Sequence, residues 1–116
     1  MPFNAPYAFM VSMDVETDKE ELFNEVYDEE HIPALLKVPG VIAVSRLKTE
    51  AGTLSLAGEE VALTGEGLPR YIAIYEIENP GVLNSPAWAE AVEEGRWADQ
   101  VRPYTSNRSH VLRKLL

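Results

Sequence analysis

The chain has 116 residues, a length typical of one folded domain, and we expect a single domain over residues 1–116. Hydrophobic residues make up 46% of it and charged residues 25%, as in soluble proteins, and no stretch approaches the roughly 18 apolar residues of a membrane span. The net charge of −9 disfavours nucleic acid and anionic membranes as partners. Because the chain has no cysteine, disulfides, thiolate nucleophiles and cysteine-ligated metals are excluded. The N-terminal residues lack the features of a signal peptide, so we expect a cytoplasmic protein.

The first residues predict a strand and then a helix. Residues 7–15, YAFMVSMDV, alternate as a strand does, with larger apolar side chains on one face and small or apolar ones on the other. Thr17 and Glu20 have the spacing of a capping box, so we expect a helix to begin at about Asp18. Its buried stripe should consist of Leu22, Phe23, Val26 and Tyr27.

Two proline signals end this helical region. Pro33 predicts a short extra turn through Leu36, and Pro39-Gly40 predicts a tight reversal before a second strand over residues 41–48. Residues 50–69 contain four glycines and no clear period, and they are expected to form a long loop or a protruding hairpin.

The second half predicts a strand, a helix and a final strand. Residues 70–78, RYIAIYEIE, have the clearest strand composition in the chain. Ser85-Pro86 is typical of a helix start, and residues 105–116 alternate as a last strand. The order β-α-β-β-α-β predicts an α+β, ferredoxin-like fold, in which two main helices cover one face of a four-stranded antiparallel sheet.

Both faces of the strand over residues 70–78 are apolar. Ile72 and Ile74 lie on one face, opposite Tyr71, Ala73 and Tyr75. Two helices cover only one face of a sheet, so a monomer would expose the other to water. Stacking two sheets face to face removes this exposure, and the sequence therefore predicts a homodimer.

Three segments of the chain resemble the dimeric α/β-barrel superfamily and, within it, the EthD-like proteins. They are YDEEHIPALLKVPGV at 27–41, YIAIYEIENPGVLNSPAW at 71–88 and VRPYTSNRSHVLRKL at 101–115, and with their spacing they cover most of the chain outside residues 50–69. The resemblance implies a ferredoxin-like fold and a dimer whose sheets form a barrel. Relatives in the superfamily include monooxygenases that need no cofactor, lactone isomerases, polyketide cyclases and haem enzymes, so the resemblance narrows the fold more than the reaction.

His31 is the leading candidate for chemistry, because histidine exchanges protons near neutral pH. The three acids before it would favour its charged form if they lay close in space, whereas burial would favour the neutral form. Three interpretations stay open: His31 caps the end of the helix, it acts as a proton-transferring group in a pocket, or it shares a metal ion with Asp28. The metal signal is weak because His110 is the only other histidine, and haem rests on superfamily analogy alone.

The last segment supplies groups that handle anions, namely Arg102, Arg108 and His110 around Tyr104. Arg108 and His110 are two residues apart, so they should share one side of the final strand. If that side faces the helices, both side chains enter the space between sheet and helices, where His31 would meet them.

Aromatic residues complete the predicted pocket. Tyr27 and Tyr75 are expected to shape it or to hydrogen-bond its ligand, although an aromatic residue in a central strand is more often part of the core. Trp88 and Trp97 are expected to be packing anchors. No dinucleotide loop, P-loop or nucleophile elbow occurs, so the sequence indicates no cofactor.

These residues lead to one functional hypothesis with two rivals. The leading one is a cofactor-independent enzyme, of monooxygenase or isomerase/cyclase type, that acts by proton transfer on a small aromatic or polyketide-like substrate. His31 would be catalytic, and Tyr27, Tyr75, Arg108 and His110 would bind the substrate. The rivals are a non-catalytic small-molecule binding protein with the same pocket and a structural dimer module without a ligand.

Overall fold

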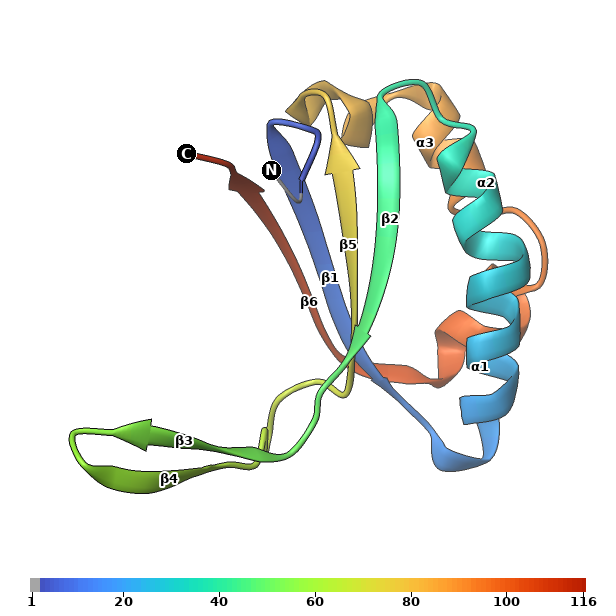
Figure 1. Ribbon diagram of the computed structural model, residues 1–116. Coiled ribbons are helices and arrows are strands. Elements are labelled where there is room, and N and C mark those ends of the chain that lie inside the picture. Colours follow the sequence, from blue (N-terminus) through green and yellow to red (C-terminus); the bar gives the residue numbers. More distant parts are fainter. Residues whose placement is uncertain (1–2) are drawn as a thin grey trace.

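A four-stranded antiparallel sheet forms the body of the molecule, and its strand order is β2-β5-β1-β6 (Figure 1). The computed structural model describes residues 3–116. The strands are β1 (Tyr7–Val15), β2 (Val41–Lys48), β5 (Tyr71–Ile77) and β6 (Thr105–Lys114). The central pair, β1 and β5, comes from the two halves of the chain, as the split βαβ plan requires. The α+β, ferredoxin-like fold that the sequence predicts is confirmed.

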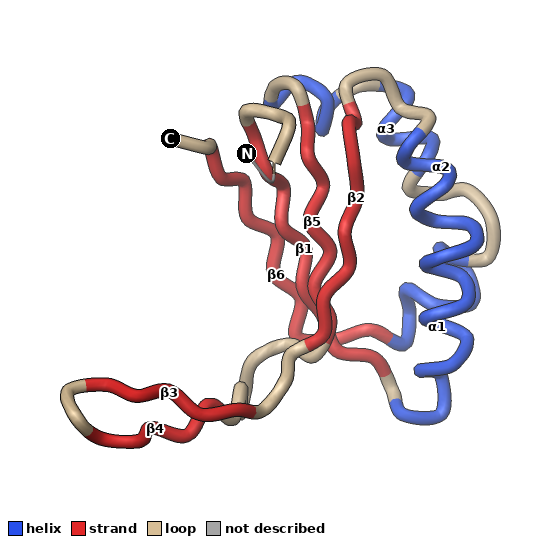
Figure 2. Tube along the Cα trace, viewed as in Figure 1, coloured by secondary structure: helices blue, strands red, loops and turns tan. Residues whose placement is uncertain are grey.

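Helical segments cover one face of this sheet (Figure 2). The first run consists of a 3-10 turn (Thr17–Lys19), α1 (Glu20–Val26), a π turn (Tyr27–His31) and α2 (Ile32–Leu36). The second run consists of a 3-10 turn (Pro80–Asn84), α3 (Pro86–Ala91), a second π turn (Trp97–Val101) and a 3-10 turn (Arg102–Tyr104). Among residues 3–116, no helix is long and apolar enough to cross a membrane.

The predicted capping box at the start of the first helix is wrong. Thr17 lies in the 3-10 turn, and neither this turn nor α1 receives a side-chain hydrogen bond at its start. The carboxylate of Glu20 lies instead 3.6 Å from a guanidinium nitrogen of Arg70. This ion pair gives Glu20 a partner outside its own helix, and α1 begins at Glu20 instead of at about Asp18.

Pro33 accounts for the π turn that precedes it. Proline lacks a backbone N–H, and its ring collides with the carbonyl four residues earlier in a regular helix. The helix accommodates Pro33 by widening the turn over Tyr27–His31, where the N–H of Ile32 donates to the carbonyl of Tyr27, five residues back. The helical region therefore continues through the predicted extra turn to Leu36. His31 does not stand at a helix end, and its interpretation as a cap is wrong.

The hydrophobic core lies between the sheet and the helices. Phe23, Val26 and Tyr27 of the predicted stripe are buried, and Leu22 is half-buried. The ring centroid of Phe23 lies 4.9 Å from that of Tyr71 on β5. Alternate residues of β5 point into this core: Tyr71, Ala73, Tyr75 and Ile77.

The opposite face of the sheet carries no helical layer. We call it the outer face, and its apolar residues are Met10, Leu47, Ile72, Ile74 and Val111. Ile72 and Ile74 are only half-buried, and Leu47 is 47% exposed. The prediction of one strand with two apolar faces, one of them uncovered by the chain's own helices, is confirmed.

Residues 50–69 form a hairpin that projects from the body (Figure 1). Its strands, β3 (Gly52–Leu56) and β4 (Glu59–Leu63), pair with each other in a separate two-stranded sheet. Of the two predicted conformations, the protruding hairpin is the one observed. We call residues 50–69 the arm.

Ser85 caps α3, and its replacement should weaken the fold moderately. The hydroxyl oxygen of Ser85 accepts a hydrogen bond from the backbone N–H of Trp88 at 3.2 Å, as the Ser-Pro signal predicts. Ser85→Ala is expected to lower the free energy of unfolding by about 1 kcal/mol in urea denaturation. Ser55→Ala, at an exposed position on the polar face of β3, is the matched control and should change it little. Equal unfolding midpoints for the two variants would contradict a stabilising cap.

Candidate functional site

A cavity of about 230 Å³ lies between the sheet and the helices. Both runs of helical segments and three of the four strands contribute to it. Its lining residues are Phe9, Val11, Met13, Tyr27, His31, Leu35, Tyr75, Trp88, Val92, Trp97, Arg102, Arg108 and His110.

All five residues that the sequence assigns to a pocket line this one cavity. Tyr27 and His31 come from the first π turn, Tyr75 comes from β5, and Arg108 and His110 come from β6. The fold therefore brings together three segments that are far apart in the chain.

His31 is held by aromatic contacts on two sides. Its ring stacks on Trp97, with centroids 4.3 Å apart and planes inclined by 21°. Its other neighbour is Tyr27, which meets it edge to face at 5.0 Å. Tyr27 and His31 belong to the first π turn and Trp97 to the second, so both irregular turns of the helical layer meet at one wall of the cavity. Such turns occur frequently at functional sites.

The imidazole of His31 is buried, and within residues 3–116 it forms no hydrogen bond. Its side chain is 5% exposed, and Nδ1 is buried without a partner. Burial lowers the pKa of His31 to about 4, and the nearby positive charge of Arg102 acts in the same direction. The ring is therefore neutral at neutral pH. A buried polar atom without a partner is costly, and a bound ligand would supply one.

The acids that precede His31 in sequence do not charge it. Asp28 is 58% exposed at its side chain, and its carboxylate pairs with Arg46 at 2.8 Å. Glu30 accepts a hydrogen bond from the Nε of Arg96 at 2.6 Å. Asp28 is thus directed to another partner, and the interpretation that it shares a metal ion with His31 is wrong. Among the described residues, no three His, Cys, Asp or Glu side chains are grouped to hold a metal.

Two buried phenols form a pair on the cavity wall. The hydroxyl oxygens of Tyr27 and Tyr75 are 2.7 Å apart. Burial raises the pKa of Tyr27 to about 12, and burial also raises the pKa of Tyr75 well above its ordinary value. Both phenols are therefore neutral at neutral pH, and one hydroxyl donates a hydrogen bond to the other. The accepting hydroxyl keeps its own proton, which it can donate to a ligand.

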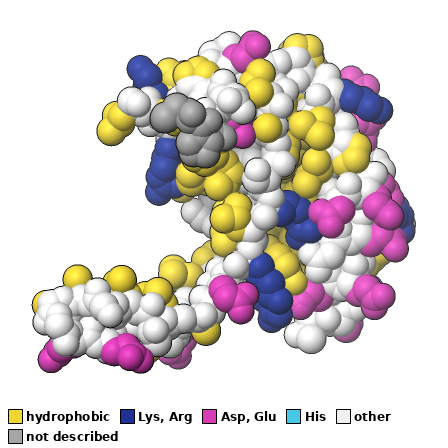
Figure 3. Space-filling model, viewed as in Figure 1, with side chains coloured by type: hydrophobic (Ala, Val, Ile, Leu, Met, Phe, Trp, Pro, Cys, Tyr) yellow, Lys and Arg dark blue, Asp and Glu magenta, His cyan; other side chains and the backbone are white. Residues whose placement is uncertain are grey.

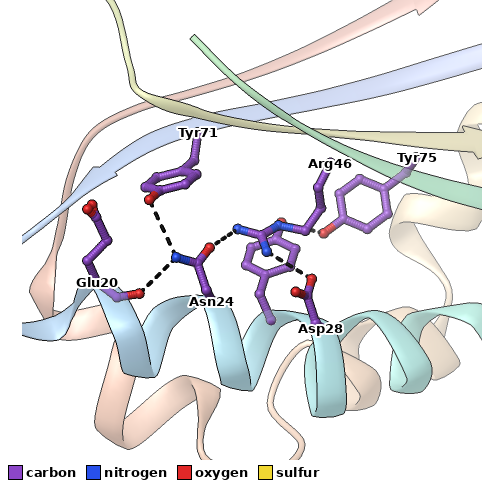
Figure 4. A network of polar contacts seen from close by, with 7 residues as sticks. Glu20, Asn24, Asp28, Arg46, Tyr71 and Tyr75 are labelled. Carbon is purple, nitrogen blue, oxygen red and sulfur yellow. Dashed lines mark hydrogen bonds and ion pairs between the residues drawn. The ribbon is translucent and has the colours of Figure 1, made fainter. Parts of the chain in front are cut away.

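Arg46 fixes Tyr27 from outside the cavity. Its guanidinium lies 4.7 Å from the centroid of the Tyr27 ring, a cation–π distance. The same guanidinium donates to Asp28 at 2.8 Å and to Asn24 at 2.7 Å. Figure 4 shows this network, in which Asn24 continues to the hydroxyl of Tyr71. The strand β2 thus helps to orient one of the two phenols.

The charged groups that line the cavity are all basic. Arg102 donates to Glu93 at 3.0 Å, but Arg108 has no carboxylate within ion-pair distance among residues 3–116. No described Asp or Glu lines the cavity. In a chain with a net charge of −9, this cavity is an electropositive exception.

A bulge in β6 precedes the two basic residues of that strand. Asn107 has a φ of 51°, and the register between β1 and β6 shifts at this point. The Nδ2 of Asn107 donates to Asp14 of β1 at 3.1 Å. Beyond the bulge, Arg108 and His110 both face the helices, and His110 stacks on Phe9 with centroids 6.1 Å apart. The expectation that Arg108 and His110 share one side is confirmed.

Trp88 and Trp97 do more than the packing that the sequence predicts for them. Trp88 and Trp97 were expected to be packing anchors, and both also line the cavity. No sequence signal marks the second π turn that orients Trp97, whereas the helical spacing of Trp88 and Val92 predicts the face that these two residues share. Tyr104, grouped with the anion-handling residues, lies outside the lining set and has the ammonium of Lys19 4.5 Å from its ring centroid.

No family model and no curated protein matches the sequence. Its structure is similar to that of an ethyl tert-butyl ether (EthD) family protein from Bacillus halodurans, with a TM-score of 0.60, 9% identity and coverage of 95% of this chain and 99% of the other. It is also similar to a mutant of MhuD, the haem degrader of Mycobacterium tuberculosis, with manganese protoporphyrin IX bound. That TM-score is 0.59, with 13% identity and coverage of 96% of this chain and 95% of the other.

A third similar structure is a putative antibiotic biosynthesis monooxygenase from Nitrosomonas europaea. Its TM-score is 0.56, with 16% identity and coverage of 95% of this chain and 98% of the other. Identities this low show the fold alone. The chain has the ferredoxin-like α/β fold of EthD-like and monooxygenase-like proteins, as the resemblance in the sequence implies.

Proposed function

We propose that this cavity binds a small aromatic or polyketide-like molecule with an anionic oxygen and that the protein catalyses a proton transfer on it without a cofactor. One observation carries the proposal: a buried histidine without a polar partner faces the same cavity as two neutral phenols and Arg108, which has no carboxylate within ion-pair distance among residues 3–116. Small-molecule sites typically combine mostly apolar walls with a few polar groups of this kind.

The size and walls of the cavity define the ligand class. Its volume of about 230 Å³ is just below the roughly 300–1,000 Å³ of typical ligand pockets, so one or two rings would fill it. Phe9, Tyr75 and Trp88 form edge-to-face or tilted contacts along one wall, which suits a flat aromatic ligand. Arg108 would pair with the anionic oxygen, since its guanidinium has no internal carboxylate partner.

The protonation states of His31, Tyr27 and Tyr75 decide which group can accept a proton and which can donate a hydrogen bond. The neutral imidazole of His31 accepts a proton from a carbon beside a carbonyl, and the electron pair of the broken C–H bond moves to the carbonyl oxygen. Arg108 and a phenol of the tyrosine pair stabilise the resulting enolate. Return of the proton to another carbon completes an isomerisation. In a monooxygenase, the enolate would react with dioxygen as the second substrate; one oxygen atom becomes a carbonyl at the carbon that lost the proton, and the other leaves as water with the two hydrogen atoms of that carbon.

A bound anion would also make His31 a better base. With a pKa of about 4, the free protein holds a weakly basic imidazole. Burial and the charge of Arg102 cause this low value, and a negative ligand beside the ring opposes both effects. The ligand would therefore raise the pKa of the group that deprotonates it.

A non-catalytic binding protein is the second candidate, and the low pKa of His31 favours it. In that function the imidazole would only donate a hydrogen bond to the ligand through its N–H. The third hypothesis, a structural module without a ligand, is less well supported. Such a module would have a well-packed core with little space at the position of this cavity.

Haem does not fit the site as it stands. A porphyrin is several times larger than the one or two rings that a cavity of about 230 Å³ accommodates. No step of the proposed reaction therefore involves haem.

We further propose a one-domain homodimer in which two outer faces stack and close a barrel. The half-buried Ile72 and Ile74 and the exposed Leu47 support this proposal. Burying these apolar side chains against a second sheet removes them from water and stabilises the dimer.

Ligand binding can be tested with a hydroxybenzoate and its uncharged amide as probes. The acid is expected to raise the melting temperature, and Arg108→Gln should weaken its affinity about tenfold because a charge-assisted hydrogen bond is lost. Arg113→Gln is the matched control, since Arg113 lies on the outer side of the same strand, paired with Ala8. Equal binding of acid and amide, or equal effects of the two variants, would contradict the assigned ligand class.

A further inference from the structure

The arm has one apolar and one polar face. The pairing of β3 with β4 places Leu54 opposite Val61 and Gly52 opposite Leu63. Side chains alternate along a strand, so one face of the arm carries Leu54, Leu56, Val61 and Leu63, with Glu59 opposite Leu56 at the tip, and the other carries Thr53, Ser55, Glu60 and Ala62. Every residue of the two strands is exposed, and Leu56 reaches 59%. An apolar face of this kind indicates a binding surface.

The base of the arm is anchored to the body of the protein. The backbone N–H of Thr49 donates to the carbonyl of Arg70 at 2.8 Å, and its hydroxyl donates to the carbonyl of Pro69 at 2.7 Å. The backbone N–H of Arg70 donates to Asp14 on β1 at 2.8 Å. Gly65 has a φ of 65°, and a Cβ at this position would collide with Thr49. The arm therefore leaves the sheet in a direction that the fold sets.

That direction brings the apolar face of the arm toward the outer face of the sheet. Figure 1 shows the arm leaving on the side of the sheet opposite the helices. In Figure 3, hydrophobic side chains line the edge of the arm that faces the hollow below the body, and acidic side chains line the other edge. The hollow therefore has apolar side chains of the arm on one wall and lies on the side of the proposed dimer interface.

The charges indicate what fills this hollow. The arm contains four glutamates and no lysine or arginine. The edge strand β6 has the opposite character, with Arg108, Arg113 and Lys114 and no acid. At the base of the arm, Asn107 of the chain's own β6 donates to the carbonyl of Gly67 at 3.4 Å. The strands β3 and β4 project away from the body, so the β6 that they can complement is that of a second copy.

We propose that the arm clasps a second copy of this chain. Its apolar face packs on the outer face of the partner's sheet, and Glu59, which shares that face at the tip of the arm, lies beside the partner's β6. The proposal rests on the homodimer proposed above and adds that each protomer reaches around the other. In this arrangement the arm covers apolar surface of the partner near the strand that supplies Arg108 to the cavity.

A pair of matched double variants tests the clasp. Leu54→Asn with Leu56→Asn alters the apolar face, and Thr53→Asn with Ser55→Asn alters the polar face of the same strand. The first variant should raise the dimer dissociation constant about tenfold or more, measured by sedimentation equilibrium, and the second should leave it nearly unchanged. Both should keep the wild-type circular dichroism spectrum, because among the described residues β3 and β4 pair with each other in a separate sheet and the substituted side chains are exposed.

The failures of the two proposals are distinguishable. A wild-type chain that stays monomeric would overturn both the homodimer and the clasp. A dimer whose dissociation constant is the same in both variants would overturn the clasp alone. Association of the wild type with phosphatidylcholine vesicles that the Leu54→Asn, Leu56→Asn variant loses would assign the arm to a membrane and would also overturn the clasp.

The absence of cysteine allows a direct test of the contact between protomers. A Glu59→Cys chain carries its cysteine on the apolar face of the arm, and a Ser109→Cys chain carries its cysteine on the outer side of β6. The two chains are mixed. A short bis-maleimide should link the two chains into a mixed dimer. Replacing the second chain by Glu29→Cys, exposed on the helical side, should abolish the link. Equal yields from the two mixtures would contradict the clasp.

Discussion

Replacement of His31 by Gln is expected to lower the turnover number by a factor of about 10²–10⁴ while changing ligand affinity little. Glutamine occupies a similar volume and can still donate one hydrogen bond into the cavity, but it cannot accept a proton from carbon. The effect should be large because His31 is the buried imidazole of the cavity: both phenols carry their protons, Arg102 and Arg108 are charged, and the other lining histidine, His110, is exposed on β6.

The measurement combines exchange and binding. Deuterium exchange at the carbon between the two carbonyls of a cyclic 1,3-dicarbonyl probe, followed by NMR, reports the proton transfer, and calorimetry reports affinity. His110→Gln tests the second imidazole of the lining, and because His110 is exposed on β6 this variant should slow exchange far less than His31→Gln. Glu29→Gln, at an exposed position outside the cavity lining, is the matched control and should leave exchange unchanged. If His31→Gln exchanges the probe as fast as the wild type, the protein binds ligands without catalysis by this residue.

Acidification is expected to destabilise the fold through the same residue. The pKa of His31 is about 4 in the folded chain, compared with its ordinary value of 6.5. Between these two values the unfolded chain binds more protons than the folded one, so stability rises with pH across this window. The penalty is absent above about pH 6.5 and reaches about 2 kcal/mol near pH 5 and about 3 kcal/mol near pH 4.

The contribution of His31 can be separated from that of the carboxylates. Urea denaturation of the wild type and of His31→Gln at about pH 7.5 and about pH 5 gives four free energies of unfolding. Carboxylate titration is common to both proteins and cancels in the difference, whereas glutamine does not titrate. The wild type should therefore lose about 2 kcal/mol more than the variant on acidification. Parallel losses would mean that the imidazole is accessible to protons in the folded state.

Much of the fold could be predicted because local and global signals agree in this chain. Alternation in residues 7–15 and 70–78, the Ser85-Pro86 start and the helical stripe each indicate one element, and the order of elements allows few topologies. The same periodicities predicted which residues line the cavity. Tyr27 belongs to the predicted helical stripe and His31 follows it four residues later, about one helical turn on. Arg108 and His110 share one side of a strand, and all four residues line the cavity between the two layers.

The missed features depend on contacts between distant segments. The capping box failed because Glu20 pairs with Arg70, at the base of the arm, and sequence spacing does not reveal that partner. The stacking of Trp97 on His31 requires two π turns, which widen a helix in response to packing and to Pro33. The pKa of His31 was also undetermined, because burial competes with neighbouring acids and only the folded chain shows that Asp28 is engaged elsewhere.

Asp14 lies between the arm, which we propose to clasp a second copy, and the cavity, which we propose to bind a ligand. One of its carboxylate oxygens holds the backbone of Arg70 at the base of the arm, and the other holds Asn107, directly before Arg108. A shift of Asp14 on association of two chains would therefore reach the arginine that faces the ligand. By thermodynamic linkage the influence is reciprocal: if pairing of the chains tightens ligand binding, the ligand tightens the pairing by the same factor. Ligand affinity would then depend on protein concentration, and a dilute sample would report a weaker site than a concentrated one.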